Sequence, residues 1–325
     1  MIKKILVTGG AGYIGSNVVD FIFSKNPGVK IYVLDNLSTG HKRLVHPKAV
    51  FIKADLTDCK KLLPIFKKIK PDIVFHFGGL SQVGESNKKP EKYFRNNILG
   101  GSSLLKAMNA CGCKKIIFSS SASVYGIPKK KSITETHSLN PISVYGQTKM
   151  AFEKYLDLFG KFFGFKFLSL RYFNAGGASS NYKCGEIHIP ETHLIPNILQ
   201  SIKENKILEV YGNDYKTKDG TCVRDYIHVT DIANAHFLGM KYLEKENSKS
   251  QFVNLGSGKG FSVMEIINKC ERITKIKARI KITQKRPGDP PVLIASKTKA
   301  KRILGWQPRK SIDEIVKSAW QFIQQ

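Results

Sequence analysis

Short runs of β-branched and aromatic residues alternate with longer amphipathic segments along the first half of the chain. The runs that predict strands lie at residues 5–7, 31–34, 50–52, 73–76 and 116–118. Short strands separated by helices form βαβ units, whose strands pair in parallel. The run at 73–75 is apolar at consecutive positions, which suits a strand covered by helices on both faces. The pattern therefore predicts an α/β fold with a doubly wound parallel sheet.

The pattern changes after residue 175, where loops containing Gly, Asn and His separate shorter helical segments. We expect residues 1–175 to form the first domain and residues 176–325 a second, smaller α/β lobe that binds the substrate. A segment near 224–256 is expected to return to the first domain, and the two lobes to share one cleft. Capping boxes of the form Ser-x-x-Glu predict two helix starts in the second lobe. They are Ser262 with Glu265 and Ser311 with Glu314.

The composition is that of a globular protein, with 42% hydrophobic and 24% charged residues. No apolar run approaches the roughly eighteen residues that a membrane-spanning helix needs. Met1 to Lys4 lead directly into the first predicted strand, which leaves no room for a secretion signal. The six cysteines show neither Cys-x-x-Cys spacing nor a disulfide-dense pattern, as expected in a reducing compartment. We therefore expect a cytoplasmic protein, and the sequence predicts no metal site.

The formal net charge of +28 is the one unusual feature of the composition, and it arises from 53 basic and 25 acidic residues. Most of the basic residues are lysines in small groups scattered along the chain. Scattered charge of this kind favours a solvated basic surface. Recruitment of anionic substrates and weak non-specific contact with RNA are the alternatives. Neither a membrane nor a specific nucleic acid is an expected partner.

A glycine-rich turn follows the first predicted strand, where residues 8–15 read Thr-Gly-Gly-Ala-Gly-Tyr-Ile-Gly. The glycines match a dinucleotide-binding fingerprint in two registers, one beginning at Gly10 and the other at Gly9. Residues without Cβ atoms allow backbone amides and a helix N-terminus to approach a pyrophosphate closely. A simple tight turn is the alternative. The strand before the turn and the helix-like residues 16–22 after it favour a dinucleotide site in a Rossmann fold.

Asp35 ends the second predicted strand, twenty residues after the last glycine of the turn. A carboxylate at this place accepts hydrogen bonds from the adenosine ribose and repels the 2′-phosphate of NADP. NAD is therefore the expected cofactor, although Lys42 and Arg43 in the next loop leave NADP as the alternative. Asp55, followed by Leu56, is placed either to meet the adenine or to cap the following helix.

Tyr145 and Lys149 are four residues apart and are predicted on one face of a helix. The ammonium, helped by a cationic nicotinamide, can lower the pKa of the phenol from about 10 and make it a general base. Ser121, at the end of the fifth strand, can donate a hydrogen bond to the same substrate oxygen, or it is only a strand-end turn residue. A second Tyr-x-x-x-Lys match, Tyr125 with Lys129, contains a proline and is not expected on a helix.

These residues and a series of further motifs closely resemble the UDP-glucose 4-epimerases of the extended short-chain dehydrogenase/reductase family, nearly end to end. In chain order the motifs are Thr8-Gly-Gly-Ala-Gly-Tyr-Ile-Gly15-Ser16, Leu34-Asp35-Asn36-Leu37, Asp55-Leu56, His76-Phe77, Val83-Gly84-Glu85-Ser86, Asn96-Asn97, Ser119-Ser120-Ser121-Ala122-Ser123-Val124-Tyr125-Gly126, Tyr145 with Lys149, Arg171-Tyr172-Phe173-Asn174, Tyr211-Gly212-Asn213-Asp214-Tyr215, Asp219-Gly220-Thr221, Val223-Arg224-Asp225-Tyr226-Ile227-His228 and Arg286-Pro287-Gly288-Asp289. The resemblance implies NAD-dependent inversion at C4 of a UDP-hexose through a transient 4-keto sugar. UDP-glucose and UDP-galactose are the implied pair, with the N-acetylhexosamine pair open.

The resemblance also implies roles for individual residues. Cofactor-binding roles fall on Gly9, Gly12, Tyr13, Ile14, Gly15, Asp35, Asn36, Asp55, Leu56, Phe77, Asn97, Lys149 and Tyr172, catalytic roles on Ser121, Tyr145 and Lys149, and substrate-binding roles on Ser121, Tyr145, Asn174, Tyr211, Arg224, Arg286 and Asp289. Arg224 and Arg286 would hold the diphosphate, near which Asn174 would also lie. Tyr211 would stack on uracil and Asp289 would accept a ribose hydroxyl. Apolar packing and a surface carboxylate are the alternatives for these last two.

The residues before Val124 distinguish between reactions within the family. Nucleotide-sugar dehydratases carry an acidic residue at the place of Ser123, often preceded by another at the place of Ala122. Related decarboxylases tend to carry Glu at the place of Ser123. Because this chain has no acid at either position, elimination of water is poorly supported. Ser81 stands where many epimerases carry a lysine that would approach the cofactor ribose. Its absence bears on how tightly this chain retains NAD. Leu293, intermediate in bulk, leaves N-acetyl substrates open. A non-catalytic NAD-binding sensor is the alternative from another class, and a homodimer is expected by analogy.

Overall fold

The computed structural model describes residues 2–128, 130, 132–286 and 288–325. The chain divides into two compact units, each assembled from separate segments. Unit 1 consists of Met1–Gly126, Ser138–Arg171 and Ala233–Val253, and unit 2 of Ile127–His137, Tyr172–Ile232 and Asn254–Gln325.

A seven-stranded sheet forms the centre of unit 1, with the strand order β11-β7-β5-β4-β1-β2-β3. Its strands are β1 (Lys4–Thr8), β2 (Lys30–Asp35), β3 (Val50–Lys53), β4 (Ile73–His76), β5 (Lys115–Ser121), β7 (Lys166–Tyr172) and β11 (Gln251–Leu255). The pairings from β3 through β2, β1 and β4 to β5 are all parallel. The order reverses on either side of β1, and ligands of open α/β sheets bind at the carboxyl ends of the strands beside such a reversal.

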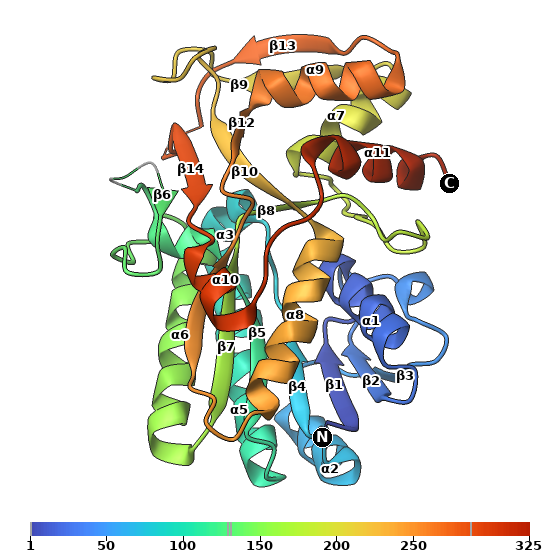
Figure 1. The fold of residues 1–325 in the computed structure, drawn as a ribbon, viewed down its shortest axis with the longest axis vertical. Helices are drawn as coiled ribbons and strands as arrows, with labels where there is room; N and C mark the ends of the chain where they lie inside the picture. The colour runs from blue at the N-terminus through green and yellow to red at the C-terminus, as the bar shows by residue number, and fades with distance from the viewer. Residues whose placement is uncertain (1, 129, 131, 287) are drawn as a thin grey trace. The chain divides into compact units, whose positions relative to one another are not determined.

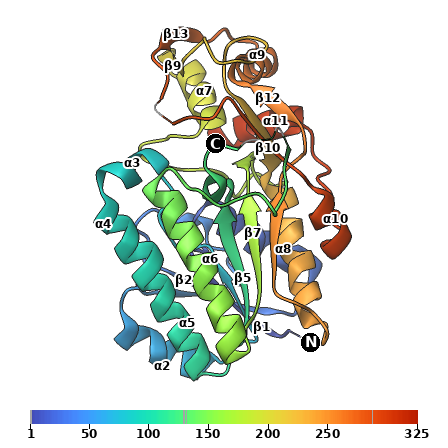
Figure 2. The same ribbon diagram turned by 90° about the vertical axis from the view of Figure 1, so that its left-hand side faces the viewer.

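Helices cover both faces of this sheet (Figures 1 and 2). They are α1 (Tyr13–Lys25), α2 (Cys59–Ile69), α3 (Val83–Lys88), α4 (Pro90–Tyr93), α5 (Gly100–Ala110), α6 (Val144–Phe163) and α8 (Val229–Glu244), with short helices η1 (Lys42–Leu44), η2 (Phe94–Leu99) and η3 (Ala122–Tyr125). The rings of Phe21 on α1 and Phe237 on α8 meet on one face, 6.1 Å apart. On the other face, Leu62, Leu104 and Phe152 pack in one buried cluster that joins α2, α5 and α6 to the strands. The predicted doubly wound parallel sheet is therefore confirmed.

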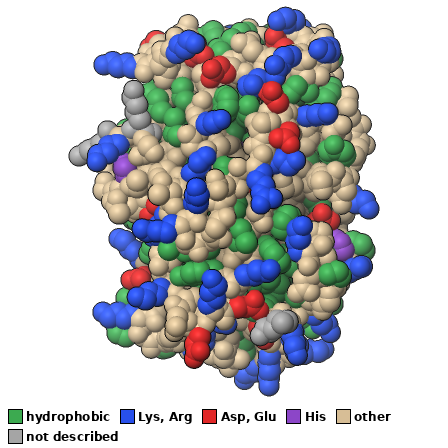
Figure 3. All heavy atoms as spheres, in the orientation of Figure 1, with side chains coloured by type: hydrophobic (Ala, Val, Ile, Leu, Met, Phe, Trp, Pro, Cys, Tyr) green, Lys and Arg blue, Asp and Glu red, His purple; other side chains and the backbone are tan. Residues whose placement is uncertain are grey.

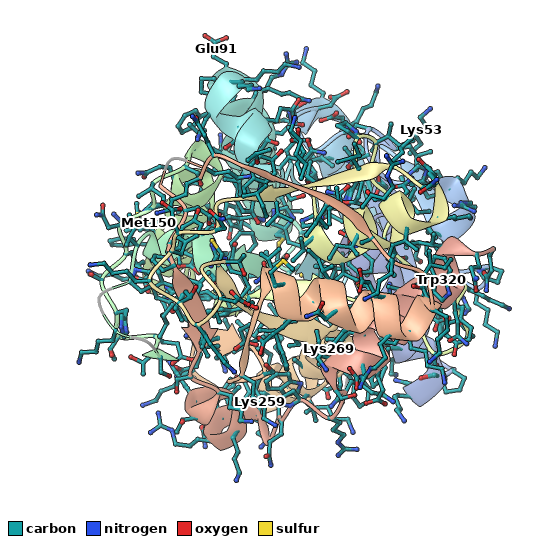
Figure 4. All side chains as sticks on the ribbon, turned by 90° about the horizontal axis from the view of Figure 1, so that it is seen from above. Lys53, Glu91, Met150, Lys259, Lys269 and Trp320 are labelled. Atoms are coloured by element: carbon teal, nitrogen blue, oxygen red, sulfur yellow. The ribbon has the colours of Figure 1, made fainter. Side chains whose placement is uncertain are left out.

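Unit 2 contains smaller sheets and its own core. Its strands are β6 (Ser132–Ile133), β8 (Asn174–Gly176), β9 (Ile207–Tyr211), β10 (Val223–His228), β12 (Gly260–Ser262), β13 (Arg279–Thr283) and β14 (Val292–Ala295), and its helices are α7 (Leu194–Lys203), α9 (Val263–Thr274), α10 (Thr298–Leu304) and α11 (Ile312–Ile323). Strand β10 pairs with β12, β14 and β8, while β9 pairs with β13 alone. Both predicted capping boxes are present, at the starts of α9 and α11. Lys269 on α9, labelled in Figure 4, donates to Asp313 on α11 over 2.8 Å.

No helix among the described residues has both the length and the apolar character that crossing a bilayer requires. On the face shown in Figure 3, Lys and Arg side chains are dispersed among uncharged and acidic ones. Dispersed charge of this kind matches a solvated basic surface more closely than a binding stripe for a polyanion.

Candidate active site

The glycine turn follows β1 and packs closely against the backbone that follows β4. Gly9 has a φ of +69°, and a Cβ added to it would lie 2.6 Å from the backbone nitrogen of Gly78, after β4. A Cβ on Gly15 would lie 2.3 Å from the carbonyl oxygen of Gly9, whereas one on Gly12 would come no closer than 3.3 Å to the same atom. A Cβ on Gly10 would also be crowded, at 2.9 Å from the side chain of Val33, so crowding does not separate the two predicted registers. Gly12 is the least crowded of these four glycines.

Helix α1 begins at Tyr13, directly after this turn. The backbone N–H groups of Tyr13, Ile14 and Gly15 belong to its first turn, where no carbonyl of the same helix can accept them. Such a helix start attracts anions, because its aligned peptide dipoles place partial positive charge there. The arrangement fits the predicted contact with a pyrophosphate.

Asp35 connects the end of β2 to the glycine turn. Its Oδ2 accepts a hydrogen bond from Ala11 N–H at 3.0 Å, and its Oδ1 accepts one from Leu37 N–H at 2.8 Å. Burial raises the pKa of this carboxyl, and the two backbone amides oppose the rise. Each carboxylate oxygen has a second lone pair, so both can still accept a ribose hydroxyl.

Asp55 lies beside this group through Asn36, whose Nδ2 donates to Asp55 Oδ2 over 2.7 Å. Thr57 donates to the other carboxylate oxygen from both its backbone and its side chain. The alternative that Asp55 caps the next helix is wrong, because the N-cap of α2 is Asp58. The structure thus gathers the turn, Asp35, Asn36 and Asp55 at the carboxyl ends of β1 to β3.

The other proposed cofactor residues differ in what their side chains do. Leu56 packs against Gly78, and the ring of Phe77 lies 4.9 Å from that of His236. Asn97 is fully engaged within unit 1, because its Oδ1 accepts from Leu80 N–H and its Nδ2 donates to the Leu80 carbonyl and to Thr148 Oγ1. Its amide therefore orders the segment after β4 against helix α6.

Helix α6 carries the predicted catalytic pair. Tyr145 and Lys149 are both buried, and the Lys149 ammonium lies 5.7 Å from the centroid of the Tyr145 ring. Lys149 Nζ donates to the Ser119 carbonyl at 2.8 Å, which ties it to the end of β5. Ser121, the last residue of β5, interacts with Tyr145 and acts to lower the pKa of its phenol. Ser121 also caps η3, because its Oγ accepts a hydrogen bond from Ser123 N–H at 3.1 Å. The predicted catalytic role and the alternative role as a turn residue at the strand end are therefore compatible.

Burial opposes the lowering of the Tyr145 pKa that is predicted from Lys149 and a cationic nicotinamide. Burial raises the pKa of Tyr145 to about 12, and only the Ser121 hydroxyl opposes the rise. Burial likewise lowers the pKa of Lys149 to about 8, against the opposing field of Glu153. The physical reason is that a buried phenolate and a buried ammonium each lose hydration. Spacing along a helix does not reveal that loss.

Sequence reasoning missed the residues that hold this pair in place. Tyr145 N–H donates to Ser86 Oγ at 3.0 Å and Val144 N–H to Asn87 Oδ1 at 3.0 Å, so α3 secures the first turn of α6. The motif Val83-Gly84-Glu85-Ser86 in the sequence was the signal that could have indicated the contact between α3 and α6. Glu153, one helical turn after Lys149, forms a buried ion pair with Arg171 over 2.7 Å. Lys129, of the second Tyr-x-x-x-Lys match, lies outside the described residues.

The predicted substrate residues of unit 2 are paired with one another. Arg224 forms an ion pair with Asp289, although the sequence assigned them to different parts of the substrate. The guanidinium of Arg286 stacks on Tyr211, 3.9 Å from the ring centroid. Asn174 Nδ2 donates to the Asp225 carbonyl at 3.1 Å. Tyr172 ends β7 and is buried.

Comparison with known proteins gives one consistent result. The family model described as GDP-mannose 4,6 dehydratase matches residues 6–319. A UDP-glucose 4-epimerase of Lactobacillus helveticus is 47% identical over 98% of this chain and 96% of its own. The crystal structure of UDP-glucose 4-epimerase from Brucella ovis in complex with NAD is 41% identical, with a TM-score of 0.94 and coverage of 98% of both chains. That of the Bifidobacterium longum enzyme in complex with NAD+ and UDP is 34% identical, with a TM-score of 0.92 over 99% and 98% of the two chains.

Matches of this extent come from both sequence and structure, and they agree with the glycine turn, Asp35 and the pair on α6. The dehydratase description covers the broader family, whereas the relatives that match nearly end to end are epimerases. The chain belongs to the UDP-glucose 4-epimerases of that family.

Proposed function

We propose that this chain interconverts UDP-glucose and UDP-galactose by NAD-dependent epimerisation at C4, with Tyr145 as the general base. The observation that carries the proposal is the junction of β5 and α6, where the Ser121 hydroxyl lowers the pKa of the Tyr145 phenol and the Lys149 ammonium lies beside the Tyr145 ring. Tyr145 would take the proton of the sugar 4-hydroxyl while Ser121 donates to the same oxygen. NAD, when bound, accepts the C4 hydride and returns it to the opposite face of the 4-keto sugar.

A dehydratase or decarboxylase of the same family is disfavoured by the residues that follow β5. Ala122 and Ser123 offer no carboxyl group to move a proton at C5, and Ser123 is engaged with Ser121 through both its N–H and its hydroxyl. A dehydrated or decarboxylated product, seen by mass spectrometry, would establish that alternative.

Incubation of the purified protein with a panel of UDP-sugars tests the proposal directly. UDP-galactose should give UDP-glucose with no net consumption of NAD, and absence of this product with added NAD would refute the proposal. The panel should include the N-acetylhexosamine pair. Leu293 pairs in register with Arg224 between β14 and β10, so its bulk lies beside a proposed substrate residue and bears on whether that pair is accepted.

The substrate roles proposed for unit 2 follow from the chemistry of its paired residues. Arg224 and Arg286 would bind the diphosphate, since a guanidinium presents a planar set of donors to phosphate oxygens. Diphosphate binding to Arg224 would release Asp289 to accept a ribose hydroxyl. Uracil would take the place of Arg286 against the ring of Tyr211, and Asn174 would contact the same part of the substrate.

A non-catalytic NAD-binding sensor is the second candidate, because the surface is strongly basic. The intact arrangement of Ser121, Tyr145 and Lys149 counts against it. Salt-sensitive RNA binding together with no turnover of any UDP-sugar would favour it.

The Asp35→Asn variant is expected to bind NAD roughly 10- to 150-fold more weakly. The amide replaces with an NH2 group one of the two carboxylate oxygens that accept from Ala11 and Leu37, and it removes the charge. A hydrogen bond to a charged group contributes about 1.5–3 kcal/mol. Titration calorimetry with NAD and with NADP measures the effect, and the preference for NAD should narrow. Asp157→Asn, an exposed site on α6, is the control, and equal NAD affinity in both variants would contradict the assignment.

We also propose that the chain forms a homodimer through α6 and the neighbouring helix η2. Phe162 is 65% exposed and Leu99 is 60% exposed, and Phe94, Leu158 and Phe163 are also exposed on these helices. Large exposed apolar side chains on neighbouring helices are typical of an interface.

The double variant Leu158→Glu with Phe162→Glu is therefore expected to be monomeric in light scattering, because two carboxylates would be buried at the contact. The control is Ile280→Glu with Ile282→Glu on β13, which carries exposed apolar residues in unit 2. A monomeric wild-type chain, or a dimer that survives the α6 changes, would contradict this interface.

A further inference from the structure

Two histidines and two glutamates converge in the loop of unit 2 between β8 and α7. Glu186, His188, Glu191 and His193 each offer one donor atom, and the four atoms all lie within 4.8 Å of one another. His188 Nδ1 lies 3.2 Å from Glu186 and 3.7 Å from Glu191, and His193 Nδ1 lies 2.7 Å and 3.3 Å from the same two carboxylates. Two imidazole nitrogens and two carboxylate groups are therefore close enough together to surround one ion.

We propose that these four residues form a binding site for a divalent transition metal, with Zn²⁺ as the cation that fits them best. Zinc bound tetrahedrally by imidazole nitrogen and carboxylate oxygen at about 2.0–2.2 Å keeps its ligand atoms about 3.3–3.5 Å apart. The histidine-to-carboxylate distances of 2.7 to 3.7 Å, in which the two histidines approach different oxygens of Glu191, lie around this separation. Imidazole donors favour zinc over magnesium and calcium, which prefer shells made of oxygen.

Burial and hydrogen bonding support a site for a cation. The side chains of Glu186 and Glu191 are only 8% and 7% exposed, and charged carboxylates are rarely buried without a compensating charge. His188 Nδ1 is buried and, although it lies 3.2 Å from Glu186, it does not have the geometry of a hydrogen bond, which leaves it available as a ligand. Glu191 Oε1 accepts from the backbone N–H groups of Thr192 and His193 at 2.8 and 2.9 Å. Contacts of this kind orient a metal-binding carboxylate.

The charges of the donors match a divalent ion. Two neutral imidazoles and two carboxylates carry a total charge of −2, which one divalent cation cancels. Two protonated histidines would also cancel it, so a simple ion-pair cluster is the competing explanation that the experiment must separate.

The donor set indicates a structural site. Four protein ligands fill a tetrahedral shell and leave no position for substrate or water, unlike catalytic zinc sites, which keep one open. His193 is the N-cap residue of α7, and Gly185 packs so closely on Phe322 of α11 that an added Cβ would lie 2.3 Å from the ring. A bound metal would therefore fix the loop to α7, beside helix α11.

The test is metal binding by the full-length chain. Wild-type protein, stripped with a chelator and dialysed against Zn²⁺, should retain one equivalent by elemental analysis and unfold at a higher temperature than the stripped form. Co²⁺ in place of Zn²⁺ should give the intense visible bands of a tetrahedral complex. The variant Glu186→Gln with Glu191→Gln should lose the bound equivalent, the thermal shift and the bands.

Two controls make the result specific to this cluster. His41→Gln removes a histidine outside it, and Cys184→Ser removes a thiol of the same loop that is not among the four donors. Both variants should retain zinc. Failure of the wild-type chain to retain zinc, or retention of a full equivalent by the double glutamine variant, would overturn the proposal and leave the ion-pair cluster as the explanation.

Discussion

The Tyr145→Phe variant is expected to lower kcat for epimerisation by roughly 10²- to 10⁴-fold, the usual contribution of a general base. The change removes only the phenolic oxygen, so fold and NAD content should stay as in the wild type. Initial rates with UDP-galactose, measured alongside bound NAD, check both parts. The residual rate reflects what binding and the remaining groups contribute.

The pH dependence adds a second readout to this prediction. Since burial raises the pKa of Tyr145 to about 12, the reactive phenolate becomes more abundant as pH rises toward that value. The wild-type rate should therefore increase with pH over the range in which the protein is folded. The residual rate of Tyr145→Phe should lose this dependence.

Tyr155→Phe is the matched control on the same helix. Tyr155 OH lies 3.4 Å from Ser102 Oγ, away from the end of β5, and its loss should change kcat by less than about twofold. Near wild-type activity of Tyr145→Phe would refute the assigned base.

The features predicted correctly from sequence are those that depend on local spacing. Glycines at fixed intervals specify the turn between β1 and α1, and hydrophobic runs predicted five of the seven strands of the doubly wound sheet, β1 to β5. A separation of four residues placed Tyr145 and Lys149 on one helix. The two capping boxes are also local patterns, and both are present.

The features that sequence could not supply depend on which distant residues meet. Asn97 reaches Thr148 across 51 positions, and Arg224 reaches Asp289 across 65. The pKa of Tyr145 also depends on how deeply its side chain is buried, which helical spacing does not reveal. The His and Glu cluster before α7 was missed because its donors alternate with Ile, Pro and Thr in an irregular loop, without a recognised metal-binding spacing.

Glu153→Gln is expected to destabilise the protein by about 3–5 kcal/mol, because it leaves a buried guanidinium without its counter-ion. Glu153 Oε1 accepts from Arg171 Nε at 2.9 Å and from Ser169 Oγ at 2.7 Å, and Oε2 accepts from Arg171 Nη2 at 2.7 Å. Both side chains of the pair are almost fully buried. Urea unfolding followed by circular dichroism measures the free energy of unfolding.

A comparison of variants separates the unpaired charge from loss of packing. Glu91→Gln is the control at a side chain that projects outward in Figure 4, and it should change stability by less than about 0.5 kcal/mol. Replacing the pair together, as Glu153→Leu with Arg171→Met, should restore much of the stability, since an apolar pair of similar volume leaves no buried charge. If the double variant were instead less stable than Glu153→Gln, packing and the Arg171 contact to Tyr125 at 2.8 Å would dominate at this site. Glu153 also raises the pKa of Lys149, so in Glu153→Gln the ammonium should lose its proton at a lower pH than about 8.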